Sequence, residues 1–146
     1  MGHIGGRQKM AVITELLRSE ADGSVSFGNY ELAAKSKLDD FEFQGDIYKV
    51  KTFGEITKLE KNGMFLYESV PGTAVESLKV SESGMTFAVE GKEDAQITVQ
   101  LEDDTEYDIT IDGEDHGQMK SNMGGKISLS VELEAGKAAL VSIQKR

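Results

Sequence analysis

The side chains best suited to chemistry in this 146-residue chain gather between residues 102 and 116. Glu102-Asp103-Asp104 form an acidic run, and Asp112, Glu114 and His116 follow at alternate positions. Oxygen-rich loops of this kind can bind Ca²⁺, but this pattern has a histidine at its third position and no acidic ligand at its far end. The spacing therefore does not predict a calcium site, and we expect solvated turns here.

Catalysis would need partners that the sequence does not supply. His116 could act as a general base, but nothing in the sequence brings Ser121 or a carboxylate next to it. Two carboxylates roughly 5–10 Å apart could hydrolyse a glycoside, but a chain with 26 acidic residues contains such pairs by chance. We predict no catalytic residue, no metal site and no cofactor, and we retain Asp112, Glu114 and His116 as candidate binding residues.

Two alternating runs must position these residues. Tyr107, Ile109 and Ile111 alternate with polar residues, and Ile127–Leu133 repeats the pattern. Strict alternation places the apolar side chains on one face of a strand. Asp112-Gly113 supplies the left-handed backbone positions of a tight turn, and Gly-containing turns separate further short runs as far as Ile143. The pattern predicts an all-β fold with an immunoglobulin-like β-sandwich in the C-terminal half.

The N-terminal half shows two hairpin signals, each with an alternative. Val12–Glu20 precedes Asp22-Gly23, which favours a hairpin with the following strand over a short helix. Asn62-Gly63 joins two further strand-like runs, although a helix capped by Thr52 and Glu55 competes with the first of them. We expect hairpins at both places, and hence a smaller β module before the sandwich.

Glu31–Asp46 is the least regular stretch of the chain. We expect an exposed connection that is held by three apolar anchors, Leu38, Phe41 and Phe43. Tyr30 and Tyr48 flank this stretch, and aromatic faces are what sugar-binding modules present to pyranose rings. Core packing is the stronger expectation for all four tyrosines of the chain, because they lie in strand-like runs, but Tyr30 and Tyr48 are the better candidates for exposure, and we name them as further candidate binding residues.

Composition excludes several classes of protein. The chain has no cysteine, so disulfides and thiolate metal sites are absent. Its formal charge of −10 repels phosphate backbones, which argues against a nucleic-acid partner. No apolar run approaches the roughly 18 residues of a membrane span, and no secretory signal precedes the strands. We expect an acidic cytoplasmic protein.

The strand pattern divides the chain into three parts. Residues 1–9 lack periodicity, and Ile4–Arg7 can be encoded by a purine-rich ribosome-binding sequence at a suitable distance from Met10. We therefore expect an unstructured leader that is not native, an N-terminal β module over residues 10–80 and a C-terminal β-sandwich over residues 81–146. Whether the two modules share one core stays open at this point.

The residues also resemble two groups of proteins. Tyr107–Leu133, with its Y-x-I-x-I-D-G and S-N-x-G-G-K-I-S-L-S-V-E-L, resembles the accessory β-sandwich module of polysaccharide-acting enzymes. Ile13–Arg18, Ser26–Tyr30 and Gly63–Gly72 resemble a family of small uncharacterised proteins from anaerobic gut bacteria, some of which are labelled endosialidase. The first resemblance implies a fold, and the second implies a bacterial origin.

The endosialidase label does not fit the residues present. Sialidases hold the sugar carboxylate with three converging arginines, whereas this chain has only Arg7, Arg18 and Arg146. We therefore expect a non-enzymatic binding or interaction module with a protein or glycan partner, or one that forms a homo-oligomer through an edge strand. The alternative is a carbohydrate-related module or a small carbohydrate-active hydrolase that uses carboxylates between Glu102 and Asp115.

Overall fold

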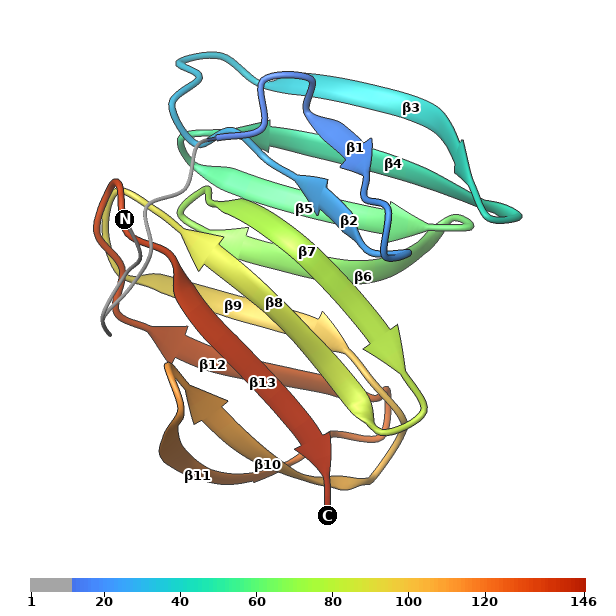
Figure 1. Ribbon diagram of the computed structural model, residues 1–146, viewed down its shortest axis with the longest axis vertical. Helices are drawn as coiled ribbons and strands as arrows, with labels where there is room; N and C mark the ends of the chain where they lie inside the picture. The colour runs from blue at the N-terminus through green and yellow to red at the C-terminus, as the bar shows by residue number, and fades with distance from the viewer. Residues whose placement is uncertain (1–11) are drawn as a thin grey trace.

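The structure is a computed structural model that describes residues 12–146 (Figure 1). The predicted leader, residues 1–9, and the predicted start at Met10 lie outside the described residues. Within the described part the chain forms strands and no helix, and hence no helix that could span a membrane. The strands are β1 (Leu17–Ser19), β2 (Val25–Phe27), β3 (Ser36–Phe43), β4 (Asp46–Phe53), β5 (Ile56–Lys61), β6 (Met64–Val70), β7 (Ala74–Ser81), β8 (Gly84–Glu90), β9 (Ala95–Gln100), β10 (Glu106–Ile111), β11 (Glu114–Lys120), β12 (Lys126–Val131) and β13 (Ala139–Lys145).

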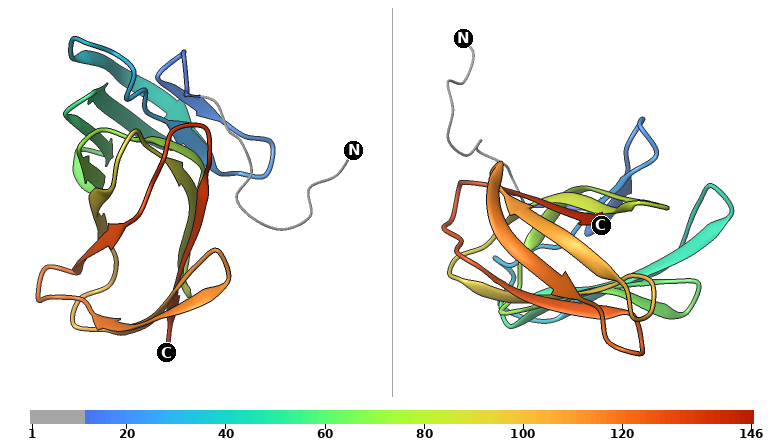
Figure 2. Two further views of the ribbon diagram at one scale, coloured as in Figure 1. Left: turned by 90° about the vertical axis from the view of Figure 1, so that its left-hand side faces the viewer. Right: turned by 90° about the horizontal axis from the view of Figure 1, so that it is seen from below.

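The strands form two antiparallel sheets that lie face to face (Figures 1 and 2). The seven-stranded sheet has the order β1-β2-β7-β8-β13-β10-β11, and the six-stranded sheet has the order β12-β9-β6-β5-β4-β3. The predicted all-β class and the sandwich architecture are confirmed.

A single hydrophobic core fills the space between the sheets. Its buried side chains come from the inner faces of both sheets, while the edge strands β3 and β11 add only partly buried residues. Tyr67 of β6 makes edge-on ring contacts with Phe27 of β2 and Phe87 of β8, at centroid distances of 5.1 and 5.6 Å. The boundary expected between residues 80 and 81 falls within β7, just before its last residue Ser81, and core residues lie on both sides of it.

Three predicted hairpins are confirmed. β1 pairs with β2, β5 with β6, and β10 with β11. Asn62 and Gly63 have φ angles of 53° and 77°, and Asp112 and Gly113 have 54° and 81°. Two successive positive φ angles are the geometry of the turn that matches the twist of a hairpin, and Asn-Gly and Asp-Gly adopt it most readily.

The prediction that Glu31–Asp46 forms an irregular connection is wrong over half of that range. Eight of its residues form β3, which pairs with β4 at one edge of the six-stranded sheet. Asp40 has a φ of +56°, and the pairing register shifts between Leu38 and Phe41. This bulge turns Leu38, Phe41 and Phe43 toward the core despite their uneven spacing, and it hides the alternation that identifies a strand.

The turn at Ala135-Gly136-Lys137 joins the last two strands, but these strands do not pair with each other. β12 pairs with β9 in one sheet, whereas β13 lies between β8 and β10 in the other. The turn carries only the bridge between Glu134 and Lys137, and the chain crosses here from one sheet to the other. Alternation tells which face of a strand is buried but not which strand it pairs with.

Candidate functional site

Tyr30 and Tyr48 are both buried, as core packing predicts, so the exposure for which these two were preferred as binding residues is absent. Their exposed fractions are 7% and 8%. Tyr48 points from β4 into the core, where burial and the nearby charge of Asp46 raise its pKa. Tyr30 lies just after β2 and reaches a carboxylate sixty residues away in the sequence.

That carboxylate belongs to Glu90, the last residue of β8. The Tyr30 hydroxyl donates a short hydrogen bond to Oε2 of Glu90. Only 3% of Glu90 is exposed, and its other oxygen, Oε1, is buried with no hydrogen-bond partner. Burial and the hydrogen bond to this carboxylate raise the pKa of Tyr30 well above its ordinary value, so Tyr30 stays protonated and keeps donating.

Buried hydroxyl groups fix the backbone that carries Tyr30. The N–H of Asn29 donates to Oγ1 of Thr52 at 2.9 Å, and that oxygen also contacts Oγ1 of Thr57 at 2.8 Å. Thr57 in turn donates to the backbone carbonyl of Thr73. Gly28 passes so close to this carbonyl that a Cβ atom on it would come within 2.5 Å of the oxygen. The segment before Tyr30 is therefore held in one position.

A cavity of about 640 Å³ opens beside Tyr30, and we call it the Tyr30 cavity. It is lined by Tyr30, Glu31, Leu32, Ala33, Gly54, Glu55, Val70, Pro71, Gly72, Lys92 and Glu93. These residues come from the loop after β2, the β4–β5 and β6–β7 connections and the β8–β9 turn. Within residues 12–146, neither Lys92 nor any of the three glutamates forms an ion pair.

The other predicted binding residues lie at a different place. Asp112 sits in the β10–β11 turn, where its carboxylate accepts a hydrogen bond from the N–H of Leu140 at 2.9 Å. Glu114 and His116 are exposed on β11, an edge strand. His116 lines a separate cavity of about 310 Å³ between the two sheets, together with Met119 and residues of β9, β10 and β12. His116 and Tyr30 thus belong to different cavities.

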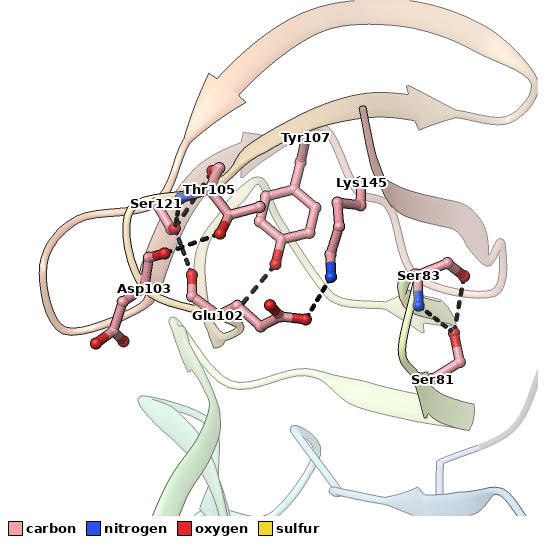
Figure 3. A network of polar contacts seen from close by, with 8 residues as sticks. All are labelled: Ser81, Ser83, Glu102, Asp103, Thr105, Tyr107, Ser121 and Lys145. Atoms are coloured by element: carbon pink, nitrogen blue, oxygen red, sulfur yellow. Dashed lines mark hydrogen bonds and ion pairs between the residues drawn. The ribbon is translucent and has the colours of Figure 1, made fainter.

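The acidic run at Glu102 is part of a structural network (Figure 3). The N–H of Glu102 donates to the Tyr107 hydroxyl at 3.1 Å, and its carbonyl accepts from Ser121. The carboxylate of Glu102 pairs with Lys145, while that of Asp104 pairs with Lys120 at 3.3 Å. In the described part of the chain, no three metal-ligating side chains come together here or elsewhere. These groups fasten the β9–β10 loop to its neighbours.

Sequence reasoning missed Glu90. The strand Met85–Glu90 alternates, with Met85, Phe87 and Val89 buried in the core, so Glu90 falls on the face that should meet solvent. It is buried because Tyr30 covers it, and nothing in the local pattern indicates that contact. No sequence pattern distinguished Glu31, Glu55 and Glu93 as candidate site residues either, since exposed glutamates are common in turns.

Searches of protein-family models, curated proteins and solved structures found no match to the chain.

Proposed function

We propose that this chain is a non-enzymatic binding module whose ligand site is the Tyr30 cavity. The observation that carries the proposal is the buried Tyr30–Glu90 pair at a cavity of ligand-binding size. Ligand sites are typically concave, of roughly 300–1,000 Å³, mostly apolar and supplied with a few well-placed polar groups. The Tyr30 cavity combines apolar walls at Leu32, Val70 and Pro71 with unpaired charges.

The absence of a catalytic arrangement among the described residues favours binding over catalysis. Arg18 pairs with Glu15, Glu20 and Glu76, whereas Arg146 pairs with Glu106 and Asp108. Two arginines committed to different carboxylates do not form the converging cluster that a sugar carboxylate needs.

The second candidate is a carbohydrate-related module or a hydrolase that uses carboxylates between Glu102 and Asp115. It has less support, because Glu102 and Asp104 each pair with a lysine, and Glu102 belongs to the loop network of Figure 3. Hydrolase activity predicts release of reducing ends from a polysaccharide panel, and loss of that release in Glu102→Gln.

A cavity-filling variant tests the binding proposal. Ala33 lines the Tyr30 cavity, and its neighbour Ala34 is exposed but does not line it. A library of small metabolites and glycans is screened against the protein by NMR chemical-shift changes. We expect hits whose shifts center on the cavity, that Ala33→Trp abolishes them, and that Ala34→Trp leaves them unchanged.

Two results would contradict this proposal. One is a screen with no hit, and the other is a set of hits that both tryptophan variants bind equally well. Light scattering of the same samples tests the wider proposal that the protein acts through self-association at a sheet edge.

A further inference from the structure

The charges around the Tyr30 cavity are unbalanced. Glu31, Glu55 and Glu93 face a single lysine, Lys92, so the lining carries a formal charge of −2. None of these four side chains is neutralised by an ion pair within residues 12–146. A concave site with an excess of one sign of charge concentrates ligands of the opposite sign. The cavity therefore favours a cation over an anion.

The Tyr30–Glu90 pair is an independent second observation. Glu90 stands one hydrogen bond behind the Tyr30 wall of the cavity, and Oε1 of this carboxylate is buried with no partner. Glu90 does not itself line the cavity, so its unpaired oxygen is out of reach of a ligand, but this buried carboxylate lies directly behind the Tyr30 wall. A carboxylate in such a poorly solvated position attracts a cation bound in the cavity more strongly than an exposed carboxylate at the same distance would.

The remaining walls indicate what carries the positive charge. Leu32, Val70 and Pro71 are apolar, and 54% of Val70 is exposed. An alkyl stem would cover this surface, whereas a hydrated metal ion would leave it in water. No group of three metal-ligating side chains occurs in residues 12–146.

We propose, on the basis of the binding function above, that the Tyr30 cavity takes a compact alkylammonium ligand. The ammonium group meets the carboxylates of Glu31, Glu55 and Glu93, and the alkyl stem packs on Leu32, Val70 and Pro71. The same chemistry is present in a free alkylamine and in the side chain of a lysine, so the test includes both.

Calorimetry and NMR with matched probes test the proposal. The probes are n-pentylamine, n-pentanol, pentanoate and a short neutral peptide with one central lysine. We expect n-pentylamine to bind at least about tenfold more tightly than n-pentanol, which lacks only the charge, and pentanoate not to bind. Tighter binding of the peptide than of n-pentylamine identifies a lysine side chain as the ligand form.

Charge variants at exposed positions give the control. Glu55 and Glu93 are exposed, so Glu55→Gln and Glu93→Gln should fold normally, and each should weaken n-pentylamine binding by roughly three- to tenfold. Lys92→Gln should strengthen binding. Glu132→Gln, which removes an exposed carboxylate outside the cavity, should leave binding unchanged.

The two proposals fail in different ways. If n-pentanol or pentanoate binds at least as tightly as n-pentylamine, and Ala33→Trp abolishes that binding, the ligand class is wrong and the binding site stands. If n-pentylamine does not bind, or if it binds equally well to Ala33→Trp, the alkylammonium proposal is overturned. Failure of the whole metabolite and glycan library against the cavity overturns the binding function itself.

Discussion

Removing one hydroxyl, that of Tyr30, should destabilise the whole sandwich. Tyr30→Phe keeps the ring but leaves both oxygens of the Glu90 carboxylate without a partner, at a position where only 3% of the residue is exposed. A hydrogen bond to a charged group stabilises a protein by about 1.5–3 kcal/mol, and a buried polar group that has lost its hydrogen-bond partner destabilises it to a similar extent. We therefore expect the free energy of unfolding to fall by about 2 kcal/mol.

Urea denaturation measures this change. With a slope of about 2 kcal/mol per M for a domain of this size, the unfolding midpoint should fall by about 1 M. Tyr48→Phe is the matched control, because Tyr48 is equally buried but its hydroxyl has no hydrogen-bond partner among residues 12–146. Its midpoint should move by less than about 0.3 M.

A double variant tests the cause. In Tyr30→Phe/Glu90→Met both partners become apolar, and replacing both members of a buried pair is often nearly neutral. The double variant should therefore recover most of the stability that Tyr30→Phe loses. The reasoning is refuted if Tyr30→Phe unfolds at the wild-type urea concentration, or if the effects of the two substitutions simply add.

Three further predictions concern the scaffold. The hydrogen bond from Ser26 lowers the pKa of Glu20 below its ordinary 4.5. The ionised Glu20 therefore stabilises the fold above pH 4.5, and this stabilisation is lost as the pH falls further. In Glu20→Gln, the free energy of unfolding measured by urea denaturation should depend less on pH in the acid range. Burial raises the pKa of Tyr67 far above 10.0, so stability should fall as the pH rises above 10.0, and phenolate absorbance should appear together with loss of circular dichroism. Gly28→Ala places a Cβ 2.5 Å from a backbone carbonyl at a φ of +97° and should lower the thermal midpoint more than Gly63→Ala, whose φ is also positive but whose Cβ meets nothing within 4 Å.

The local features of the fold could be predicted from the sequence. Strands that alternate strictly, such as β10 and β12, were identified, as were the turns at Asn62-Gly63 and Asp112-Gly113. β3 was missed because one residue, Asp40, takes a left-handed conformation and shifts the alternation by one place. A bulge depends on the partner strand, so the period of a single strand cannot reveal it.

The pairing order and the candidate site depend on contacts between distant residues. Alternation could not show that β13 lies between β8 and β10, because any strand with an apolar face satisfies the same pattern. For the site, Tyr30 was chosen for a wrong reason, exposure, and Glu90 was not chosen at all. Their contact spans sixty residues, and neither residue carries a local signal of it.

The position of β13 also has a consequence while the chain is being made. β13 is the thirteenth strand in chain order within residues 12–146, yet it pairs with β8 on one side and β10 on the other. Until Ala139–Lys145 leaves the ribosome, the strand that belongs between β8 and β10 is missing, and each of these two strands has one unpaired edge. Exposed edges are where strands of other chains attach. The nascent chain is therefore most open to aggregation just before its seven-stranded sheet is completed, and chaperone binding would matter most at that stage.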